Sequence, residues 1–280
     1  MAKSIRDAYG EALVKYGVIN NKIVVLDADV SSSTKTGGFK EACPERFFSV
    51  GIAEANMTAM AAGFASVGKI PFITSIGLIS ARSFGSYSRL GIKMMGSYGG
   101  LSDAFDGPSH HSVEDVAIMR ALPSFKVYIA SDEVMTGWLV KNAIDDKAPM
   151  YIRLSREVFP PLYHGNERFE DGKGKILRDG KDVTIIACGI MVSKALEAAE
   201  LLKAAWETGA IVTAEEHSVI GGLGSAVAET LCMENIHVPM GFIGMQDCHA
   251  ECGPYSKLLH KYGLDAEAIA GKVRKAFKAK

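Results

Sequence analysis

Short apolar runs rich in β-branched residues recur along the chain and alternate with longer segments whose apolar residues have helical spacing. The short runs predict strands buried in a parallel sheet, and the longer segments predict helices. In the first part of the chain we expect strands at residues 22–26, 46–50, 70–73, 127–130 and 150–154. The helices expected around them cover residues 4–16, 52–68, 81–95, 113–120 and 132–144, and around residues 94–100 the chain is expected to turn back into sheet and loop.

The pattern is interrupted at residues 161–181, which are rich in Gly and charged residues and which we interpret as a linker, with at most a short edge strand. Beyond it, strands are expected at residues 183–187, 210–214 and 238–243, and helices at residues 193–206, 224–233 and 265–278. Because strand and helix alternate throughout, the fold class is α/β, with two parallel-sheet domains at residues 1–160 and 182–280, the second smaller.

Residues 49–68 are almost entirely apolar or small, apart from Glu54, Asn56 and Thr58. Such a composition predicts a buried helix, and its many Ala and Gly residues let another backbone approach closely, so we expect it to pack in an interface or between layers. Since a charged carboxylate is costly there, Glu54 should hold its proton or share it with a nitrogen base. Glu54 is therefore a candidate catalytic residue, although an acidic first-turn residue can also simply complement the helix dipole.

Polar residues follow the first expected strand. Asp27 and Asp29 lie at its carboxyl end, which is where ligands bind in open α/β sheets. The next segment, residues 31–38, reads Ser-Ser-Ser-Thr-Lys-Thr-Gly-Gly. It is expected to be a flexible loop, which either offers hydroxyls to a phosphate or sugar or is simply solvated.

A second polar loop, residues 103–111, precedes a helix that Ser112 and Asp115 are expected to open as a capping box. The positive end of a helix receives anionic or hydroxylated ligands well. The loop residues Asp106, His110 and His111 are therefore candidate binding residues, although both histidines are equally compatible with loop positions that have no such task.

The bulk composition excludes some classes of function. The 280 residues are 48% hydrophobic and carry a formal net charge of −1, so nothing favours binding to nucleic acid or to an anionic membrane. No signal peptide or membrane-spanning run is recognisable, and a cytoplasmic location is expected. The five cysteines are scattered and odd in number, which argues against a disulfide framework. A metal site at residues 247–252 is disfavoured, because no second pair with zinc-site spacing accompanies it.

Three motifs occur in order: G-I-A-E-A-N-M, D-G-P-S-H-H-S-V-E-D-V-A-I-M-R and E-E-H-S-V-I-G-G-L-G-S-A-V-A-E. With them the chain resembles, over nearly its whole length, the C-terminal half of transketolases, and most closely the separate C-terminal subunit of split transketolases. The resemblance implies a pyrimidine-binding domain followed by the smaller transketolase C-terminal domain. It also implies a transferase of carbohydrate metabolism, as in the pentose phosphate pathway, that uses thiamin diphosphate to move a two-carbon ketol unit from a ketose to an aldose.

The resemblance assigns roles to individual positions. Glu54 would hydrogen-bond the N1′ atom of the cofactor's aminopyrimidine ring and favour its imino tautomer, which takes the proton from thiazolium C2. His110 and Asp106 would contact sugar hydroxyls, with His110 also assisting proton transfer. The remaining matches are Arg6, Ser33 and Arg156, where the family binds the substrate phosphate, and Asp29, at the contact between cofactor and subunits.

One motif of the family is missing. Transketolases bind the diphosphate and its Mg²⁺ through a G-D-G motif on a separate domain, and this sequence contains no G-D-G. The resemblance therefore implies a partner, the transketolase N-terminal subunit, which would hold diphosphate and metal in an α2β2 assembly with the active site between subunits.

Other positions depart from the family. Where related subunits have aromatic residues packed on the pyrimidine, this chain has Ile76 and Ile79, so aliphatic contact would replace stacking. Tyr98 stands where a histidine of the phosphate site is expected, which opens the way to a changed donor or acceptor. Near Lys203–Ala205 the chain lacks roughly one βα unit, of about 25–30 residues, as a true loss or as an omitted stretch.

Alternatives within the same chemistry are a deoxyxylulose phosphate synthase-like condensation and the beta subunit of a 2-oxo acid dehydrogenase. The D-G-P-S-H motif favours transketolase over both. From another class, the chain could be a non-catalytic partner subunit that kept the fold. Retention of Glu54 and His110 argues against this, since a purely structural subunit has no need of a buried carboxylate.

Overall fold

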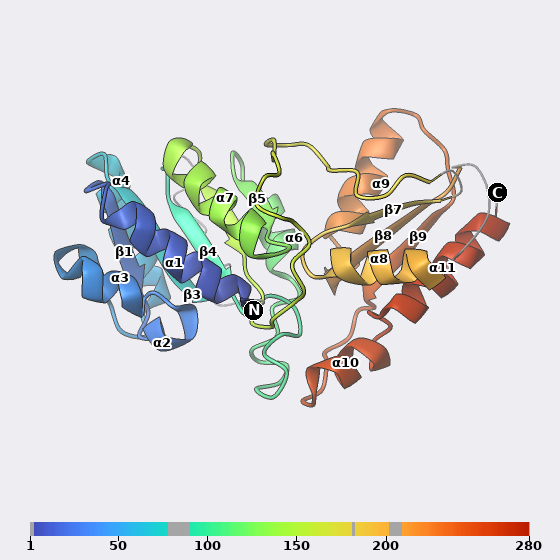
Figure 1. Ribbon diagram of the computed structural model, residues 1–280, viewed down its shortest axis with the longest axis horizontal. Helices are drawn as coiled ribbons and strands as arrows, with labels where there is room; N and C mark the ends of the chain where they lie inside the picture. The colour runs from blue at the N-terminus through green and yellow to red at the C-terminus, as the bar shows by residue number, and fades with distance from the viewer. Residues whose placement is uncertain (1–2, 78–89, 181–182, 202–208, 280) are drawn as a thin grey trace.

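The computed structural model describes residues 3–77, 90–180, 183–201 and 209–279. Two α/β units lie side by side along the long axis of the molecule, with the N-terminus at the lower middle and the C-terminus at the far right of the view (Figure 1). The two-domain parallel α/β fold class predicted from the sequence is confirmed. Within the described ranges, none of the helices is long and apolar enough to cross a membrane.

The first unit is built on a six-stranded sheet with the order β2-β1-β3-β4-β6-β5, in which every neighbouring pair is parallel. The strands are β1 (Ile23–Asp27), β2 (Phe47–Ser49), β3 (Ile70–Ile76), β4 (Lys93–Ser97), β5 (Lys126–Ile129) and β6 (Met150–Arg153). The helices are α1 (Ile5–Gly17), α2 (Ser31–Thr34), α3 (Gly37–Ala42), α4 (Glu54–Ser66), α6 (Asp115–Arg120) and α7 (Glu133–Asp145), with a 3-10 turn, η1, at Pro44–Arg46.

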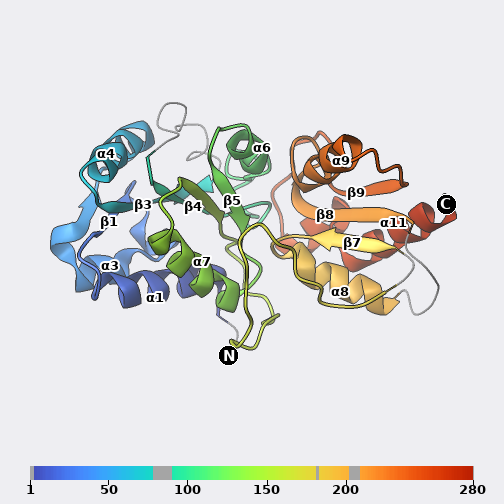
Figure 2. The same ribbon diagram turned by 90° about the horizontal axis from the view of Figure 1, so that it is seen from above.

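Helices cover both faces of this sheet, because consecutive strand residues point to opposite sides. In β1, Ile23 and Val25 join the core beneath α1, α3 and α7, whereas Val24 and Leu26 join the core beneath α4 and α6. Figure 2, which looks at the molecule from above, shows the two groups of helices on opposite sides of the sheet. All five residues of β1 are buried, and the burial of its first four, which are apolar, is what the short β-branched run predicted.

The second unit has a three-stranded parallel sheet in the order β7-β8-β9. Its elements are β7 (Thr184–Ala187), α8 (Met191–Leu201), β8 (Ile211–Ser218), α9 (Leu223–Met233), β9 (Met240–Met245), α10 (Tyr255–Lys261) and α11 (Ala266–Lys278). Helices α8 and α11 pack together on one face and α9 lies on the other (Figure 2). In α9 only Gly224 is fully buried, so this apolar helix is thinly covered within the described residues.

Several local predictions were wrong. The segment expected as a loop at residues 31–38 contains α2 and the start of α3. Lys93, expected within a helix, begins the central strand β4, close to the return to sheet expected around residues 94–100, and the start of that expected helix lies outside the described residues. Ser112 does not cap α6: the helix begins at Asp115, whose side chain turns instead to Tyr151 and Arg153. The short helix α10 was not predicted.

Helix α4 is buried on one side within this chain, and the burial expected for it in an interface stays a prediction. Met57, Thr58, Ala61 and Ala62 are buried against the sheet, but the opposite face is exposed. The exposed positions on or next to the helix include Ile52, Ala55, Asn56, Ala59, Gly63 and Val67. The helix therefore presents a surface of small and apolar residues to whatever lies beyond this chain.

Candidate functional site

The buried carboxylate of Asp27 organises the segment after β1. It accepts hydrogen bonds from the Val30 amide (2.7 Å) and from the Thr34 and Thr36 hydroxyls (2.8 Å each). Burial raises the pKa of Asp27, and the three hydrogen bonds oppose that rise. Because these bonds fold residues 30–36 back over the strand end, they place Ser33 beside α1. The sequence analysis placed Asp27 at a ligand-binding strand end, and its bonding explains why the hydroxyl-rich segment is helical.

Four of the predicted residues meet at the carboxyl ends of β1, β4 and β6. We call this group the arginine cluster; it consists of Arg6, Ser33, Tyr98 and Arg156. Arg6 Nη1 donates to the Ser33 carbonyl (2.5 Å) and to the Tyr98 phenol oxygen (2.9 Å). The guanidinium carbons of Arg6 and Arg156 lie 4.8 and 5.3 Å from the centre of the Tyr98 ring. Cations over an aromatic face are held by its quadrupole, so Tyr98 ties the two arginines together. Two neighbouring guanidinium groups at this sheet edge are well suited to an oxyanion.

The loop of residues 99–112 supplies carboxylates next to this cluster. Asp103 is buried and accepts from Arg156 Nη1 at 2.5 Å, while Asp106 is exposed. Burial and the neighbouring Asp106 raise the pKa of Asp103, and Arg156 acts in the opposite direction. His110 is half-buried, with Nδ1 3.0 Å from the Ser109 hydroxyl. His111 is buried, and burial lowers the pKa of its imidazole, so it is a neutral core residue at pH 7.

Glu54 is the first residue of α4 and lies half-buried on the far side of β1 and β3 from the arginine cluster. Within the described ranges, no hydrogen bond or ion pair joins Glu54, Ile76 or Asp29 to that cluster. Ile76 ends β3 and is half-buried, Asp29 is exposed with a positive φ of 65°, and Ile79 lies outside the described residues. The structure thus brings together four of the predicted residues and leaves the cofactor candidates apart from them.

The surroundings of Glu54 fit one part of thiamin diphosphate. The carboxyl group at the helix start can form a hydrogen bond with one ring nitrogen of a flat heteroaromatic ring, and the neighbouring Ile52, which is 83% exposed, offers apolar surface to such a ring. Among the described residues, no lysine or arginine makes a hydrogen bond or ion pair with the Glu54 side chain. The described residues at Glu54 therefore fit the pyrimidine end of the cofactor.

A buried ionic network joins the two units, and it was not predicted from the sequence. Arg153 at the end of β6 donates to Asp115 (2.9 Å) and to the carbonyl oxygens of Ser112 and Glu216, the last at 2.9 Å. Glu216 in turn accepts from the Leu101 amide at 2.8 Å. The available signal was the sequence Glu215-Glu216-His217 inside an apolar strand, where all three side chains are buried.

Burial shapes the ionisation of this network. It raises the pKa of Glu216 to about 7, against the opposing effect of Arg153, and it lowers the pKa of His217. Glu215 caps α9 by accepting from the Leu223 and Gly224 amides at 2.6 and 2.8 Å. These groups are enclosed by protein, so they connect the two units and do not form a substrate site.

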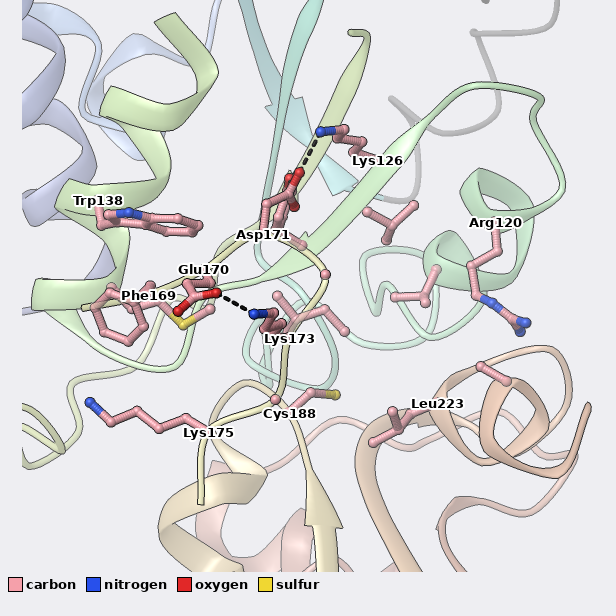
Figure 3. Close-up of a pocket in the computed structure, with 18 of the residues that line it drawn as sticks. Arg120, Lys126, Trp138, Phe169, Glu170, Asp171, Lys173, Lys175, Cys188 and Leu223 are labelled. Carbon is pink, nitrogen blue, oxygen red and sulfur yellow. Dashed lines mark hydrogen bonds and ion pairs between the residues drawn. The ribbon is translucent and has the colours of Figure 1, made fainter. Parts of the chain in front are cut away.

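The cavity in Figure 3, of about 770 Å³, lies elsewhere, between the edge strand β5, the linker and α9. The rings of Trp138 and Phe169 are in contact at one side of it, with centroids 5.5 Å apart. Lys126 is paired with Asp146 and Asp171, and Lys173 with Glu170. Because linker residues make these contacts at the side of the sheet, this cavity shows how the linker docks on β5.

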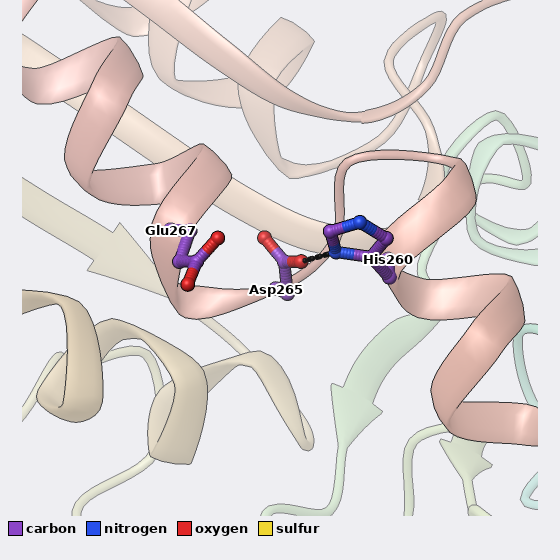
Figure 4. A group of neighbouring side chains, drawn as sticks. All are labelled: His260, Asp265 and Glu267. Atoms are coloured by element: carbon purple, nitrogen blue, oxygen red, sulfur yellow. Dashed lines mark hydrogen bonds and ion pairs between the residues drawn. The ribbon is translucent and has the colours of Figure 1, made fainter.

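His260, Asp265 and Glu267 form a surface group with metal-ligand chemistry (Figure 4). Asp265 is already engaged, since one oxygen caps α11 at the Ala268 amide (2.9 Å) and the other contacts His260 Nδ1 (2.6 Å). We explain the group as a helix cap with an exposed ion pair. All five cysteines of the chain are free.

The fold and the arginine cluster define a class, namely two-domain α/β proteins whose polar groups gather at the carboxyl edge of a parallel sheet. Comparison with known families then identifies the chain. The pyrimidine binding domain of transketolase matches residues 1–161, and the transketolase C-terminal domain matches residues 172–205 and 201–269. The chain belongs to the transketolase family, whose members are thiamin-dependent transferases, and it corresponds to the C-terminal section of these enzymes.

Two curated relatives span nearly the whole chain. A putative transketolase C-terminal section from Methanocaldococcus jannaschii is 38% identical and covers 99% of this chain and 97% of its own length. A 6-deoxy-6-sulfo-D-fructose transketolase subunit from Clostridium sp. is 39% identical and covers 95% and 92%. A solved structure described as a split gene transketolase, inactive beta4 tetramer, has a TM-score of 0.87, 42% identity and 99% coverage of both chains.

The comparisons also bear on the missing βα unit. The alignment with the M. jannaschii relative runs over 309 positions, which exceeds the 280 residues of this chain, so the relative has residues that this chain lacks. The match to the C-terminal domain is divided between two segments that meet at residues 201–205. Residues 202–208 lie outside the described part of the chain.

Proposed function

We propose that this chain is the C-terminal subunit of a two-chain transketolase that transfers a two-carbon ketol unit from a ketose to an aldose. The observation that carries the proposal is Glu54, a carboxyl group at the start of a helix whose small, apolar outer face is left exposed. A site that is open on one side requires a second chain to close it. The family match over both halves of the chain agrees with this.

Thiamin diphosphate supplies the carbanion chemistry when it is bound. We assign Glu54 to the pyrimidine N1′ atom and Ile76 and Ile79 to its ring face, with Asp29 at the contact between cofactor and subunits. We assign the diphosphate and Mg²⁺ to the partner subunit, because the sequence has no G-D-G motif. His110 and Asp106 would orient sugar hydroxyls, with His110 holding or releasing a proton near the reacting carbons.

We place the far end of the substrate at the arginine cluster, where Arg6, Ser33, Tyr98 and Arg156 meet. The named Clostridium relative acts on a ketose that ends in a sulfonate, so subunits of this kind are not restricted to phosphate. Pentose phosphates are one substrate class within the proposal. We also propose domain limits at residues 1–160 and 182–280 with a linker at 161–181.

Assembly with an N-terminal transketolase subunit, as an α2β2 tetramer, completes the proposal. The related solved structure is a tetramer of one kind of chain and is described as inactive, which is what a half-site predicts. Five free cysteines suit a reducing compartment, which supports a cytoplasmic location.

The test mixes the purified chain with its N-terminal subunit, thiamin diphosphate and Mg²⁺, and measures cofactor binding and ketol transfer. Binding and turnover should appear only in the mixture. An active chain on its own would contradict the two-chain proposal. A mixture that assembles but binds no cofactor would favour the alternative of a structural partner subunit.

A further inference from the structure

Tyr98 has a backbone conformation that bulky residues rarely adopt. Its φ is +62°, in the left-handed region, although it directly follows β4 and its side chain is only 6% exposed. A large side chain persists in this region only where the surroundings hold it, and such strain concentrates at functional sites. Here the surroundings are the two guanidinium groups of the arginine cluster.

The phenol group of Tyr98 is oriented by Arg6. Its oxygen accepts the Arg6 Nη1 hydrogen at 2.9 Å. No acceptor for the phenol hydrogen lies within hydrogen-bond distance among the residues that the structure describes, so this hydrogen can be donated to a ligand. A donor polarised by a neighbouring cation makes a stronger hydrogen bond to an anion than an isolated hydroxyl does.

Of the two guanidinium groups around Tyr98, only one has a carboxylate partner among the described residues. Arg156 is paired with Asp103 at 2.5 Å, and the nearby Asp106 adds a second negative charge. In the part of the chain that the structure covers, no carboxylate lies within ion-pair distance of Arg6. A singly charged group would therefore be balanced here, whereas a dianion would bring a second charge that no free cation meets.

We propose that Tyr98 is the specificity-determining residue of the arginine cluster and that it selects ketose substrates ending in a singly charged oxyanion, such as a sulfonate, over those ending in a doubly charged phosphate. The inference rests on the proposed ketol transfer and names the substrate class. Tyr98 supplies a hydrogen-bond donor without adding charge, because a phenol is neutral at pH 7.

The test uses the assembled enzyme with its N-terminal subunit, thiamin diphosphate and Mg²⁺, and three donors that share one carbon skeleton. These are D-fructose, 6-deoxy-6-sulfo-D-fructose and D-fructose 6-phosphate, whose far ends carry charges of zero, one and nearly two. We expect kcat/KM to be highest for the sulfonate, by roughly tenfold over each of the others, as for one hydrogen bond to a charged group.

Two substitutions separate the donor role from the charge. Tyr98→Phe keeps the ring over the guanidinium groups and removes the hydroxyl, so kcat/KM for the sulfonate should fall about tenfold through KM, with D-fructose little changed. Tyr98→His introduces a group that can gain a proton, so the sulfonate-to-phosphate ratio should move toward phosphate by about tenfold. Tyr16→Phe, on the outer part of α1, is the matched control and should change no ratio.

A wild-type enzyme that prefers the phosphate or D-fructose would overturn the inference, as would an unchanged ratio in Tyr98→His. Hydroxypyruvate, a donor too short to reach the cluster, reports on ketol transfer independently. If it gives no product, the proposed function fails. Calorimetric binding of the three sugars to the same assembly then still decides whether Tyr98 discriminates by charge.

Discussion

The Glu54 carboxyl group lies at the start of α4, half-exposed, with no hydrogen-bond partner for its side chain among the described residues. A carboxyl group in this state has capacity to bond a ligand nitrogen once a second chain covers it. Covering would also bury the apolar Ile52 beside it. Under the proposed two-chain assembly, the partner subunit would complete the apolar surroundings of this carboxyl group.

Glu54→Gln should therefore leave assembly intact and abolish most turnover. Gln has the same shape but cannot share a proton with a ring nitrogen, so kcat should fall at least about 100-fold. Assembly is checked by sedimentation and turnover by ketol transfer to an aldose. Glu11→Gln, on the exposed side of α1, is the control, and near-normal activity in Glu54→Gln would show that the carboxyl group has no catalytic part.

Glu216 gives a prediction for pH. Its pKa is raised in the folded protein from an ordinary 4.5 to about 7, so between these values the folded state binds a proton that the unfolded state has released. Its contribution to stability is thus full below pH 4.5 and is lost as pH rises to about 7. From pH 5 to pH 8 the wild type should lose about 1–3 kcal/mol of unfolding free energy relative to Glu216→Gln.

Urea unfolding of both proteins at the two pH values measures this difference. Glu41→Gln, an exposed position on α3, should track the wild type at both. His217 acts in the opposite direction, since burial lowers its pKa, but it is present in every variant and does not affect the comparison. If the wild type instead gained unfolding free energy relative to Glu216→Gln between pH 5 and pH 8, Glu216 would be ionised in the folded protein through its contact with Arg153.

Among helices and strands, the contact of the loop after β4 with β8 depends on one glycine. Gly100 has a φ of +70°, and a Cβ atom built on it would lie 2.2 Å from the Glu216 carboxyl carbon. Gly100→Ala should therefore destabilise the protein by about 2–4 kcal/mol, through both backbone strain and overpacking.

Gly137→Ala is the matched control. Gly137 lies within α7, and a Cβ atom there would have no neighbour within 4 Å. This change should stabilise the protein by about 0.5–1 kcal/mol, as expected for Ala over Gly in a helix. Thermal melting of both variants distinguishes the packing effect from the backbone preference, and equal effects in the two would contradict the close contact at Gly100.

The strands could be predicted because the local sequence is enough to recognise them. β1, β6 and β7 are short β-branched or apolar runs. Two of the failures depend on side-chain partners that helical or strand periodicity does not record. Residues 31–34 are helical because Asp27 binds the Thr34 hydroxyl, and the cap expected for α6 is lost because Asp115 is drawn to Arg153.

The candidate site divides in the same way. Arg6, Ser33, Tyr98 and Arg156 were proposed through family resemblance, and their mutual contacts depend on strand ends that the α/β pattern predicts. The buried pairing of Arg153 with Asp115 could not be predicted, because the two residues lie 38 positions apart and either would be ordinary on a surface. The periodicity of apolar residues along a chain does not indicate which charged residues will be buried next to each other.

For the molecule as a whole, the network of Arg153, Asp115 and Glu216 couples the two units. Removing one member of a buried ion pair leaves the other uncompensated, at a cost of about 3–5 kcal/mol. We therefore expect the wild type to unfold in a single calorimetric transition, and Arg153→Met to lower Tm and separate the two units into distinct transitions. Arg178→Met, which breaks only an exposed pair with Glu200, should leave one transition at nearly the same Tm.

Two transitions in the wild type would contradict this coupling. Salt offers a further check, because enclosed pairs are screened much less than exposed ones. The Tm difference between wild type and Arg153→Met should accordingly persist at high ionic strength.

The same network limits where such a polypeptide can be divided during evolution. A break in the linker at residues 161–181 would leave Arg153 and Asp115 on one fragment and Glu216 and His217 on the other, and each fragment would carry charges that only the other encloses. A break ahead of α1 severs no such pair among the described residues. We therefore expect the two units to stay on one polypeptide, and other subunits to be joined or separated outside this junction.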